Sequence, residues 1–234
     1  MSTTTSRSRC SKMPTPTRAS CCTRLRRLPK ATFRYVSAIP FSSIRKGSVP
    51  VADRERHSAL ERHYERGHFG ATGTGVARIT LSERRGLAMA QVNGAPEGDD
   101  PPALGSATVG ETTLLWTGPG QWFALSERLD AEALVAELEE RLSSSDATVS
   151  DLSHARTVVR VRGPAWRDVL AKGCPADVDA MVPGVCFASL LSHFTVVIHC
   201  VAGDCADVYV FRSFGASLWE WLRGGAEEFG YTVE

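Results

Sequence analysis

The order of strand and helix patterns over residues 146–234 leaves few architectures open to this chain. Strands are indicated where apolar and polar residues alternate, and helices where a Pro or a polar start precedes a run of helical period. The predicted elements are a strand through 157–163, a helix over 164–173, strands over 186–200 and 205–214, a helix over 215–230 and a strand over 231–234. This β-α-β-β-α-β order predicts a ferredoxin-like C-terminal subdomain, an antiparallel sheet with two helices on one face.

Residues 76–145 predict a smaller N-terminal α+β subdomain. Residues 76–83 and 87–94 both alternate and are separated by a short turn, so we expect them to form a hairpin. After a loop rich in Pro and Gly, two short strands over 112–127 flank a Thr-Gly-Pro-Gly turn, and an amphipathic helix begins near Asp130. The predicted fold class of the chain is α+β, with antiparallel sheets and helices on one face.

Charge separates the first fifty residues from the rest of the chain. Residues 1–50 hold 11 of the 27 Lys and Arg residues, no Asp or Glu and no sustained apolar period, which predicts a disordered basic segment or a misassigned start. An organellar transit peptide has the same composition. We favour a start at Val51, because valine can be encoded by the alternative start codon GTG and the charge changes abruptly there. Residues 51–75 are polar and predict a tether.

The charge of the remaining chain argues against some classes of partner. The formal net charge is +1, but residues 51–234 carry 16 of the 27 basic residues and all 26 acidic residues, a net charge of −10. An acidic chain disfavours binding to nucleic acid or to an anionic membrane, and no apolar run approaches the roughly 18 to 20 residues of a membrane span. The seven cysteines form no disulfide framework, so we expect reduced thiols in a cytoplasmic protein.

No residue pattern predicts a catalytic or cofactor-binding site. Asp151, Ser153 and His154 have the residue types of a hydrolase triad. Neighbours on an extended strand point to opposite faces, however, so we expect a hydrogen-bonding cluster at a turn. The glycine-rich segment 70–75 resembles a phosphate loop but lacks the helix that gives such loops their affinity for anions.

No metal site is predicted either. Cys200, Cys205 and His199 make an incomplete zinc set, so free thiols are expected. His63 and His68 are five residues apart, a spacing that does not bring them to one face of a helix.

Five residues are candidate contacts with a partner protein: Trp116, Trp122, Arg212, Trp219 and Trp221. Aromatic residues and Arg are enriched at protein interfaces. The two tryptophans that flank the Gly-Pro-Gly turn also fit core packing on both sides of a corner, and we favour that interpretation. The two tryptophans of the last helix lie on different sides of it, so at least one is expected to be exposed. The arginine fits an ion pair with a partner or within the chain.

Four segments carry a resemblance to a known family. They are LLWTGPGQWFAL, DLSHARTVVRVRGPAWRDVLAKGCPADVD, PGVCFASLL and FRSFGASLWEWLRGGAEEFG. Together they resemble the gamma subunit of heterotetrameric sarcosine oxidase over residues 76–234, most densely from residue 147 onward. The first segment is also similar to the aminomethyltransferase relatives of that family. Gly120 and Gln121 stand where an acidic pair is usual, so no carboxylate contact is carried over to them.

The resemblance implies a non-catalytic structural and assembly subunit of a sarcosine oxidase complex. Such an assembly of alpha, beta, gamma and delta chains converts sarcosine to glycine, transfers the one-carbon unit to tetrahydrofolate and produces hydrogen peroxide. FAD, FMN, NAD and tetrahydrofolate are implied on the partner subunits, and no cofactor on this chain. Two other classes stay open: a stand-alone folate-binding protein of the aminomethyltransferase-like class, and an interaction module of an unrelated complex.

Overall fold

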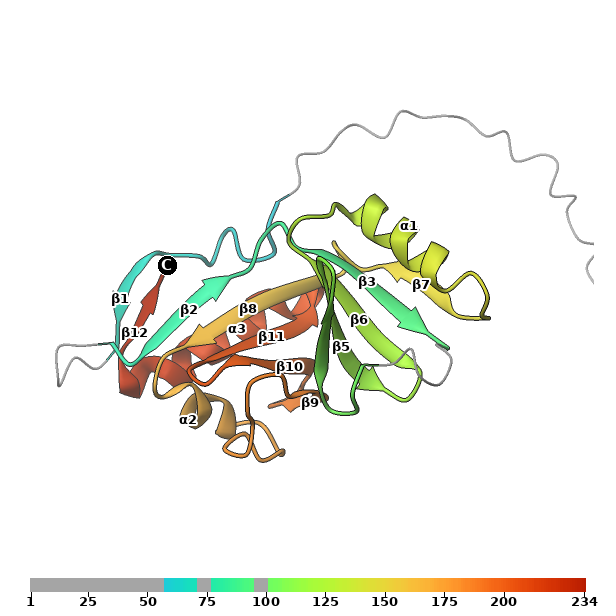
Figure 1. Cartoon of the computed structure of the whole chain (residues 1–234). Coiled ribbons are helices and arrows are strands. Elements are labelled where there is room, and N and C mark those ends of the chain that lie inside the picture. Colours follow the sequence, from blue (N-terminus) through green and yellow to red (C-terminus); the bar gives the residue numbers. More distant parts are fainter. Residues whose placement is uncertain (1–56, 71–76, 95–100) are drawn as a thin grey trace, which may run out of the picture. The chain divides into compact units, whose positions relative to one another are not determined.

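The computed structural model describes residues 57–70, 77–94 and 101–234, which belong to one compact unit, Arg54–Glu234 (Figure 1). The predictions for residues 1–50, including a start at Val51, lie outside the described residues, and so does nearly all of the glycine-rich segment. In the described part of the chain, no helix has the length and apolarity needed to span a bilayer.

The larger of two sheets is assembled from both ends of the described chain. Its strands follow the order β1-β12-β2-β8-β11-β10-β9. They are β1 (Gly67–Phe69), β2 (Ile79–Glu83), β8 (Arg156–Arg162), β9 (Cys186–Leu191), β10 (Phe194–Ala202), β11 (Cys205–Phe211) and β12 (Tyr231–Val233). Neighbouring strands are antiparallel except β12 and β2, which run parallel. Helices α2 (Trp166–Ala171) and α3 (Gly215–Ala226) cover one face of this sheet (Figure 1).

The smaller sheet has the order β4-β5-β6-β3-β7 and is antiparallel throughout. Its strands are β3 (Ala88–Asn93), β4 (Ser106–Val109), β5 (Thr112–Gly118), β6 (Gln121–Ser126) and β7 (Thr148–Asp151). Helix α1 (Ala131–Arg141) buries Leu134 and Leu138 against it. The Asp130 side chain accepts a hydrogen bond from the Ala133 N–H at 2.8 Å, which confirms the helix start predicted from the sequence.

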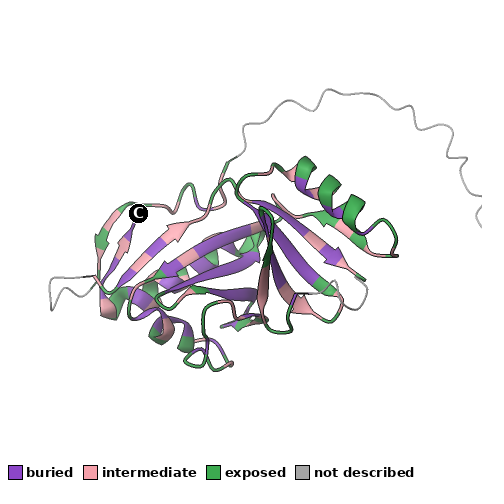
Figure 2. Ribbon diagram, in the orientation of Figure 1, coloured by how far each residue is buried: buried purple, intermediate pink, exposed green. Residues whose placement is uncertain are grey.

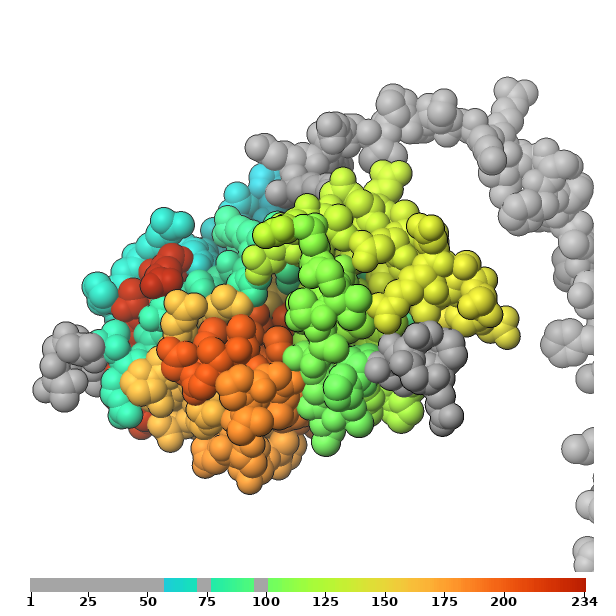
Figure 3. All heavy atoms as spheres, in the orientation of Figure 1, coloured from blue at the N-terminus to red at the C-terminus, as the bar shows by residue number. Residues whose placement is uncertain are grey.

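The central strands β8, β10 and β11 of the larger sheet carry apolar residues at successive positions and are largely buried on both faces (Figure 2). On β8, Val159 and Val161 point toward the helices, whereas Val158 points toward the smaller sheet. The cluster between the two sheets joins side chains of both: Met89, Leu115, Phe123, Leu125, Val158, Cys186, Val197 and Tyr209. In Figure 3 the atoms of β9 and β10 (orange) lie against those of β5 (green). The two sheets therefore share one apolar layer.

The α+β fold class is confirmed, and the ferredoxin-like order is present with two additions. A turn at Ser192, whose φ of 58° is left-handed, splits the strand predicted over 186–200 into β9 and β10. Strand β2 is inserted between β12 and β8, so the first half of the chain completes the sheet of the second half. Conversely, β7 comes from the second half of the chain but belongs to the smaller sheet, where it pairs with β3.

Two predictions about the first half are wrong. Strands β2 and β3 do not form a hairpin, because β2 pairs with β12 and β8 while β3 pairs with β6 and β7. Residues 57–70 are part of the folded body rather than a tether. Leu60 is fully buried, the rings of Tyr64 and Trp219 stack with centroids 5.0 Å apart, and β1 pairs with β12.

Candidate functional site

Charged side chains are buried where the two sheets face each other. Asp207 on β11 lies opposite Arg160 on β8 and opposite His199 on β10. Side chains of directly paired residues project from the same face of a sheet, and here that face turns toward the smaller sheet. A cleft of about 400 Å³ opens beside these residues and is lined by side chains of both sheets.

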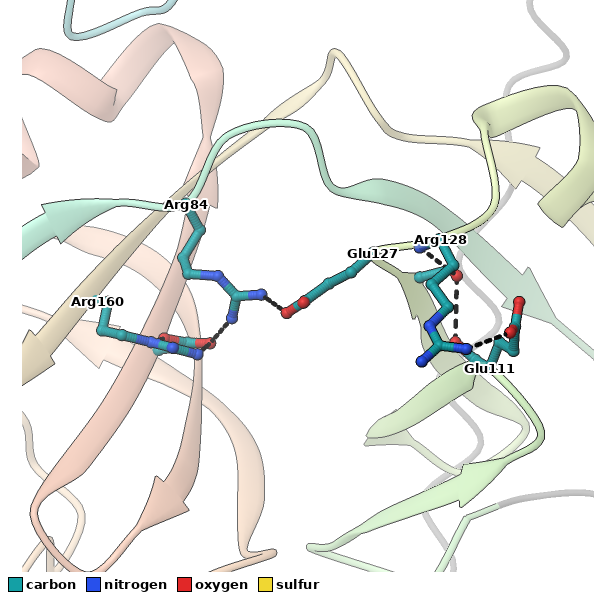
Figure 4. A network of polar contacts seen from close by, with 7 residues as sticks. Arg84, Glu111, Glu127, Arg128 and Arg160 are labelled. Atoms are coloured by element: carbon teal, nitrogen blue, oxygen red, sulfur yellow. Dashed lines mark hydrogen bonds and ion pairs between the residues drawn. The ribbon is translucent and has the colours of Figure 1, made fainter.

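Asp207 is the centre of a group of ion pairs. Its carboxylate, 1 % exposed, accepts from Arg160 Nε at 2.7 Å and Nη2 at 2.8 Å and from Arg84 Nη1 at 2.8 Å. The hydrogen bond to Asp207 raises the pKa of Arg160. Arg84 also pairs with Glu127, directly after β6, so one guanidinium links the two sheets (Figure 4). These four residues, Arg84, Glu127, Arg160 and Asp207, are called the Asp207 cluster below.

A second ion pair lies on the smaller sheet beside the Asp207 cluster (Figure 4). Arg128 Nη1 donates to Glu111 Oε1 at 2.7 Å, and both side chains are exposed. The Ser126 hydroxyl donates to the Glu111 carbonyl at 3.1 Å and accepts from the N–H groups of Arg128 and Leu129, which orders the turn into α1. The three arginines around this cleft are thus matched by three carboxylates.

Two further ionisable groups between the sheets are neutral: His199, which lines this cleft, and Cys186, which lies in the shared apolar layer. His199 is buried, and its Nδ1 has no hydrogen-bond partner among the described residues. Burial lowers its pKa, an effect that Asp207 opposes and that Arg160 and Arg84 reinforce. Burial also raises the pKa of the Cys186 thiol to about 12. The histidine is therefore uncharged at neutral pH, and the thiol is protonated and unreactive.

This arrangement is suited to holding the two sheets together rather than to bond-making chemistry. Among the described residues that line this cleft, no hydroxyl or thiol is hydrogen-bonded to a His, Asp or Glu side chain as an activated nucleophile requires. The carboxylate of Asp207 accepts three hydrogen bonds from two guanidinium groups, which suits a structural ion pair better than a general base.

A larger cleft, of about 700 Å³, opens between the β2–β3 connection, the start of α1 and the start of β8. It is called the Arg156 cleft below, after the arginine at the start of β8. Arg156 and Arg212 both line it, and Arg84 lines this cleft as well as the smaller one. Sequence reasoning had singled out only Arg212 among these residues.

Two of the five predicted interface residues are buried, and three are at least partly exposed. Trp122 and Trp219 are fully buried in the core of the chain, so their rings offer no surface to a partner. The indole N–H of Trp219 donates to a backbone carbonyl at 3.0 Å, whereas that of Trp122 has no partner among the described residues. Trp116, Trp221 and Arg212 retain exposed surface, so a partner interface at these three stays a proposal.

The surroundings of Trp221 and Arg212 differ. Trp221 lies so close to Gly173 that a Cβ at that glycine would be 2.6 Å from the indole Cζ2, and the Gly173 carbonyl accepts from the Ser192 N–H at 2.8 Å. Arg212 is exposed after β11, and its guanidinium donates to the His57 carbonyl. Arg212 is therefore bound within the chain while part of its charge still faces the Arg156 cleft.

The residues with hydrolase chemistry form the predicted turn. The Ser153 N–H donates to Asp151 Oδ1 at 2.8 Å, and the Ser153 hydroxyl accepts from the Met89 N–H at 3.0 Å, while His154 is exposed. No group of three or more His, Cys, Asp or Glu among the described residues is placed to hold a metal ion.

Sequence reasoning missed the Asp207 cluster and Arg156. Asp207, Arg160 and Arg156 lie within strands, where a charged residue between apolar ones normally marks the solvent face. Arg84 and Glu127 directly follow strands. A usable signal was present in β8 and β11, because Val158 and Tyr209 occupy the same face as the charges. Apolar residues on both faces of a strand indicate that its charges are buried, and buried charges need partners.

The sequence comparisons agree with one another. A family model described as sarcosine oxidase, gamma subunit family, matches residues 86–228. Sarcosine oxidase subunit gamma of Corynebacterium sp. (strain P-1) is 31 % identical over 126 residues, which cover 53 % of this chain and 61 % of the relative. The subunit gamma of Arthrobacter sp is 30 % identical over 131 residues, 55 % of this chain and 57 % of the relative. The matches thus span about three fifths of the length of these curated relatives.

Solved structures show the same fold at lower identity. A chain of heterotetrameric sarcosine oxidase from Corynebacterium sp. U-96, in complex with pyrrole 2-carboxylate, has a TM-score of 0.64 and 24 % identity, covering 74 % of this chain and 96 % of that chain. Aminomethyltransferase T of the glycine cleavage system from Bartonella henselae has a TM-score of 0.54 and 16 % identity, covering 75 % of this chain and 56 % of that chain. At these identities the likeness establishes the fold alone.

Proposed function

The chain belongs to the sarcosine oxidase gamma subunit family, and from this premise we propose that it is a non-catalytic assembly subunit of a heterotetrameric sarcosine oxidase. In this proposal, a cytoplasmic complex with alpha, beta and delta chains converts sarcosine to glycine, transfers the one-carbon unit to tetrahydrofolate and produces hydrogen peroxide. FAD, FMN, NAD and tetrahydrofolate are held by the partner chains. The role of this chain is to pack against the larger subunits and stabilise them.

The observation that carries the proposal is the extent of the family match. Residues 86–228 run from the connection before β3 to the end of α3, and so include all five strands of the smaller sheet and the central strands of the larger one. The shared apolar layer between the sheets lies entirely within this match. The likeness therefore concerns both sheets rather than one motif, with β1, β2 and β12 outside the match.

The state of the ionisable groups between the sheets supports a non-catalytic role. Asp207 is engaged by two arginines, His199 is kept neutral by burial and the Cys186 thiol has a pKa of about 12. Groups that act as nucleophiles or bases normally have a pKa near the working pH and a partner that activates them. The Cys186 thiol meets neither condition, and the His199 Nδ1 has no hydrogen-bond partner among the described residues. The partners of Asp207 are arginines, which it cannot activate.

A surface next to β11 supports the assembly role. Phe211 and Phe214 are 43 % and 47 % exposed and stand on either side of Arg212. Exposed aromatic rings beside an arginine are typical of protein interfaces. We assign this surface, with the partly exposed Trp221, to contact with a larger subunit.

The alternative of a stand-alone folate-binding protein requires a carboxylate that is free to bind the pterin ring. The acidic residues that line the two clefts are all engaged. Glu83 is bound by Ser58 and Arg85, Asp130 caps α1, Glu111 pairs with Arg128, and Glu127 and Asp207 belong to the Asp207 cluster. Because each of these carboxylates already has a partner within the chain, the assembly role is favoured over folate binding.

The experiment that tests the proposal is affinity purification of the tagged chain from its native host. A flavin absorbance scan and a sarcosine-dependent peroxide assay then follow on the eluate. We expect yellow, sarcosine-oxidising partners to co-purify with the chain. A colourless single chain that binds folate would refute the assembly role in favour of the alternative.

A further inference from the structure

Arg156 is a half-buried arginine whose charge is unmatched. Its guanidinium carbon lies 5.2 Å from the ring centroid of Phe123 and 3.7 Å from that of Phe211, on the face of the larger sheet that turns toward the smaller one. Among the described residues its side chain makes no hydrogen bond or ion pair, and its Nε is buried without a partner. Arg160, four residues along the same strand, has a carboxylate against it. A buried cation without a counter-charge is costly, so the difference calls for an explanation.

The cleft around Arg156 carries an excess of positive charge. Four arginines and two carboxylates line it among the described residues, Arg84, Arg85, Arg156 and Arg212 against Glu83 and Asp130. Arg84 is paired with Asp207 and Glu127, and Arg85 with Glu83, so Arg156 and Arg212 are the two cations without a carboxylate among the described residues. Both carboxylates are already used, Glu83 by Arg85 and Asp130 as the cap of α1. The chain beyond residue 50 is acidic overall, so this cationic cleft is a local feature and not a consequence of the average charge.

Apolar side chains line the same cleft. They are Leu87, Met89, Leu129 and Val158, and all four are buried or half-buried. The cleft volume of about 700 Å³ falls within the roughly 300 to 1,000 Å³ of small-molecule sites. Cationic and apolar side chains in one cleft of this size match a ligand that has a charged head and an apolar body.

We propose that the Arg156 cleft binds a small organic carboxylate, whose carboxyl group pairs with Arg156 and whose apolar body lies on Leu87, Met89 and Val158. The planar guanidinium presents a fork of donors that fits a carboxylate in two parallel hydrogen bonds. Such a ligand supplies a negative charge that none of the described residues places against Arg156. The proposal goes beyond the assembly role and does not depend on it.

Two other occupants fit the same observations less well. Residues 1–50 carry 11 positive charges and no negative ones, so they hold no carboxylate that could pair with Arg156. A carboxylate on a partner chain would match Arg156, but it would leave most of a cleft of about 700 Å³ unfilled. A partner carboxylate is therefore treated as an outcome of the test.

The test is isothermal titration of the full chain with benzoate, an aromatic carboxylate, and with benzamide, which has the same ring and no charge. We expect benzoate to bind and benzamide to bind at least about tenfold more weakly, the loss expected when a charge-assisted pair is removed. Arg156→Gln should weaken benzoate binding at least about tenfold as well. Arg128→Gln, at the other cleft, should leave it unchanged. Inorganic phosphate should bind more weakly than benzoate, because it has no apolar body.

Equal binding of benzoate and benzamide, or equal loss in the Arg156→Gln and Arg128→Gln variants, would overturn the proposal. If Arg156→Gln does not fold, chemical-shift mapping of benzoate on the unmodified chain decides instead, and shifts confined to residues outside 84–89 and 153–158 would contradict the site. In the purified complex, benzoate should still bind. Loss of binding there, with binding intact in the free chain, would show that a partner fills the cleft and would refute a small-molecule site.

Discussion

Two arginines four residues apart on β8 face the same side of the larger sheet but have different environments. Arg160 forms a bidentate pair with Asp207, whereas Arg156 lies between two phenyl rings with no acidic partner among the described residues. The charge of Arg160 is neutralised by Asp207, whereas the charge of Arg156 has no neighbouring carboxylate. The residue-scale predictions follow from this contrast.

The Asp207 cluster is predicted to contribute strongly to stability. Asp207→Asn removes the negative charge between Arg160 and Arg84, both of which are about four fifths buried. The free energy of unfolding should fall by about 3 kcal/mol, as is typical when one partner of a buried ion pair is removed. Urea denaturation followed by tryptophan fluorescence measures this change.

Glu111→Gln is the matched control for that variant, because the Glu111–Arg128 pair is exposed. It should change the free energy of unfolding by no more than about 0.5 kcal/mol. If both variants lowered the free energy of unfolding equally, burial would not explain how much the Asp207 cluster contributes to stability.

His199 is predicted to make the chain less stable in mild acid. Burial lowers its pKa in the folded state below the ordinary value near 6.5. The unfolded chain therefore takes up this proton first as the pH falls, so the stabilisation present at higher pH is lost below about pH 6.5, by at most ~1.4 kcal/mol per pH unit. His199→Gln should flatten the dependence of the unfolding free energy on pH between 7 and 5.

His154→Gln is the control for the pH experiment, because His154 is exposed on the turn before β8. It should keep the pH dependence of the unmodified chain. A His199→Gln variant with the same slope as the unmodified chain would show that the buried imidazole does not cause the effect.

At the scale of elements, local signals in the sequence predicted the strands and helices better than their pairing. The start of α1 at Asp130 and the turn between β5 and β6 depend on residues that are neighbours in the chain, a capping carboxylate and a Gly with φ of 64°. The split between β9 and β10 escaped prediction, because Ser192 adopts a left-handed φ without a Gly or Asn signal. Its N–H is bound by the distant Gly173 carbonyl.

Strand pairing between distant segments was the part of the fold that the sequence did not predict. The parallel pairing of β2 with β12 joins residues about 150 positions apart. No turn chemistry fixes such a register, which is set by burial of Ile79 and Leu81 in the helix-covered core. The same non-local packing created the Asp207 cluster and the Arg156 cleft, so neither was predictable as a site.

The exchange of strands predicts that the C-terminal half is not stable by itself. A fragment of residues 146–234 lacks β2, which pairs with both β8 and β12, and lacks the smaller sheet that covers Tyr209. It should show no cooperative thermal transition and should elute as aggregates in size-exclusion chromatography. A fragment of residues 54–234 should melt cooperatively, like the full chain. A soluble monomer of residues 146–234 with a cooperative transition would contradict the interdependence of the two sheets.

At the scale of the whole molecule, the chain combines a tightly paired interior with an exposed aromatic surface. Among the described residues, Arg160 and Asp207 are matched between the sheets whereas Arg156 is not. The exposed residues Phe211 and Phe214 lie beside Arg212. A subunit that stabilises larger chains needs a rigid body and a contact surface, but no activated group. We therefore expect this chain to stabilise the larger subunits without taking part in the reaction.

The most direct measurement of that claim is expression of the alpha, beta and delta chains with and without this chain, followed by sarcosine-dependent peroxide production per bound flavin. If the chain serves in assembly, its omission lowers the yield and thermal stability of the complex, while the turnover per flavin of the complex that does form stays within about twofold. Normal yield and stability with turnover reduced by a factor of about ten or more would contradict the account, because this chain would then contribute directly to the reaction.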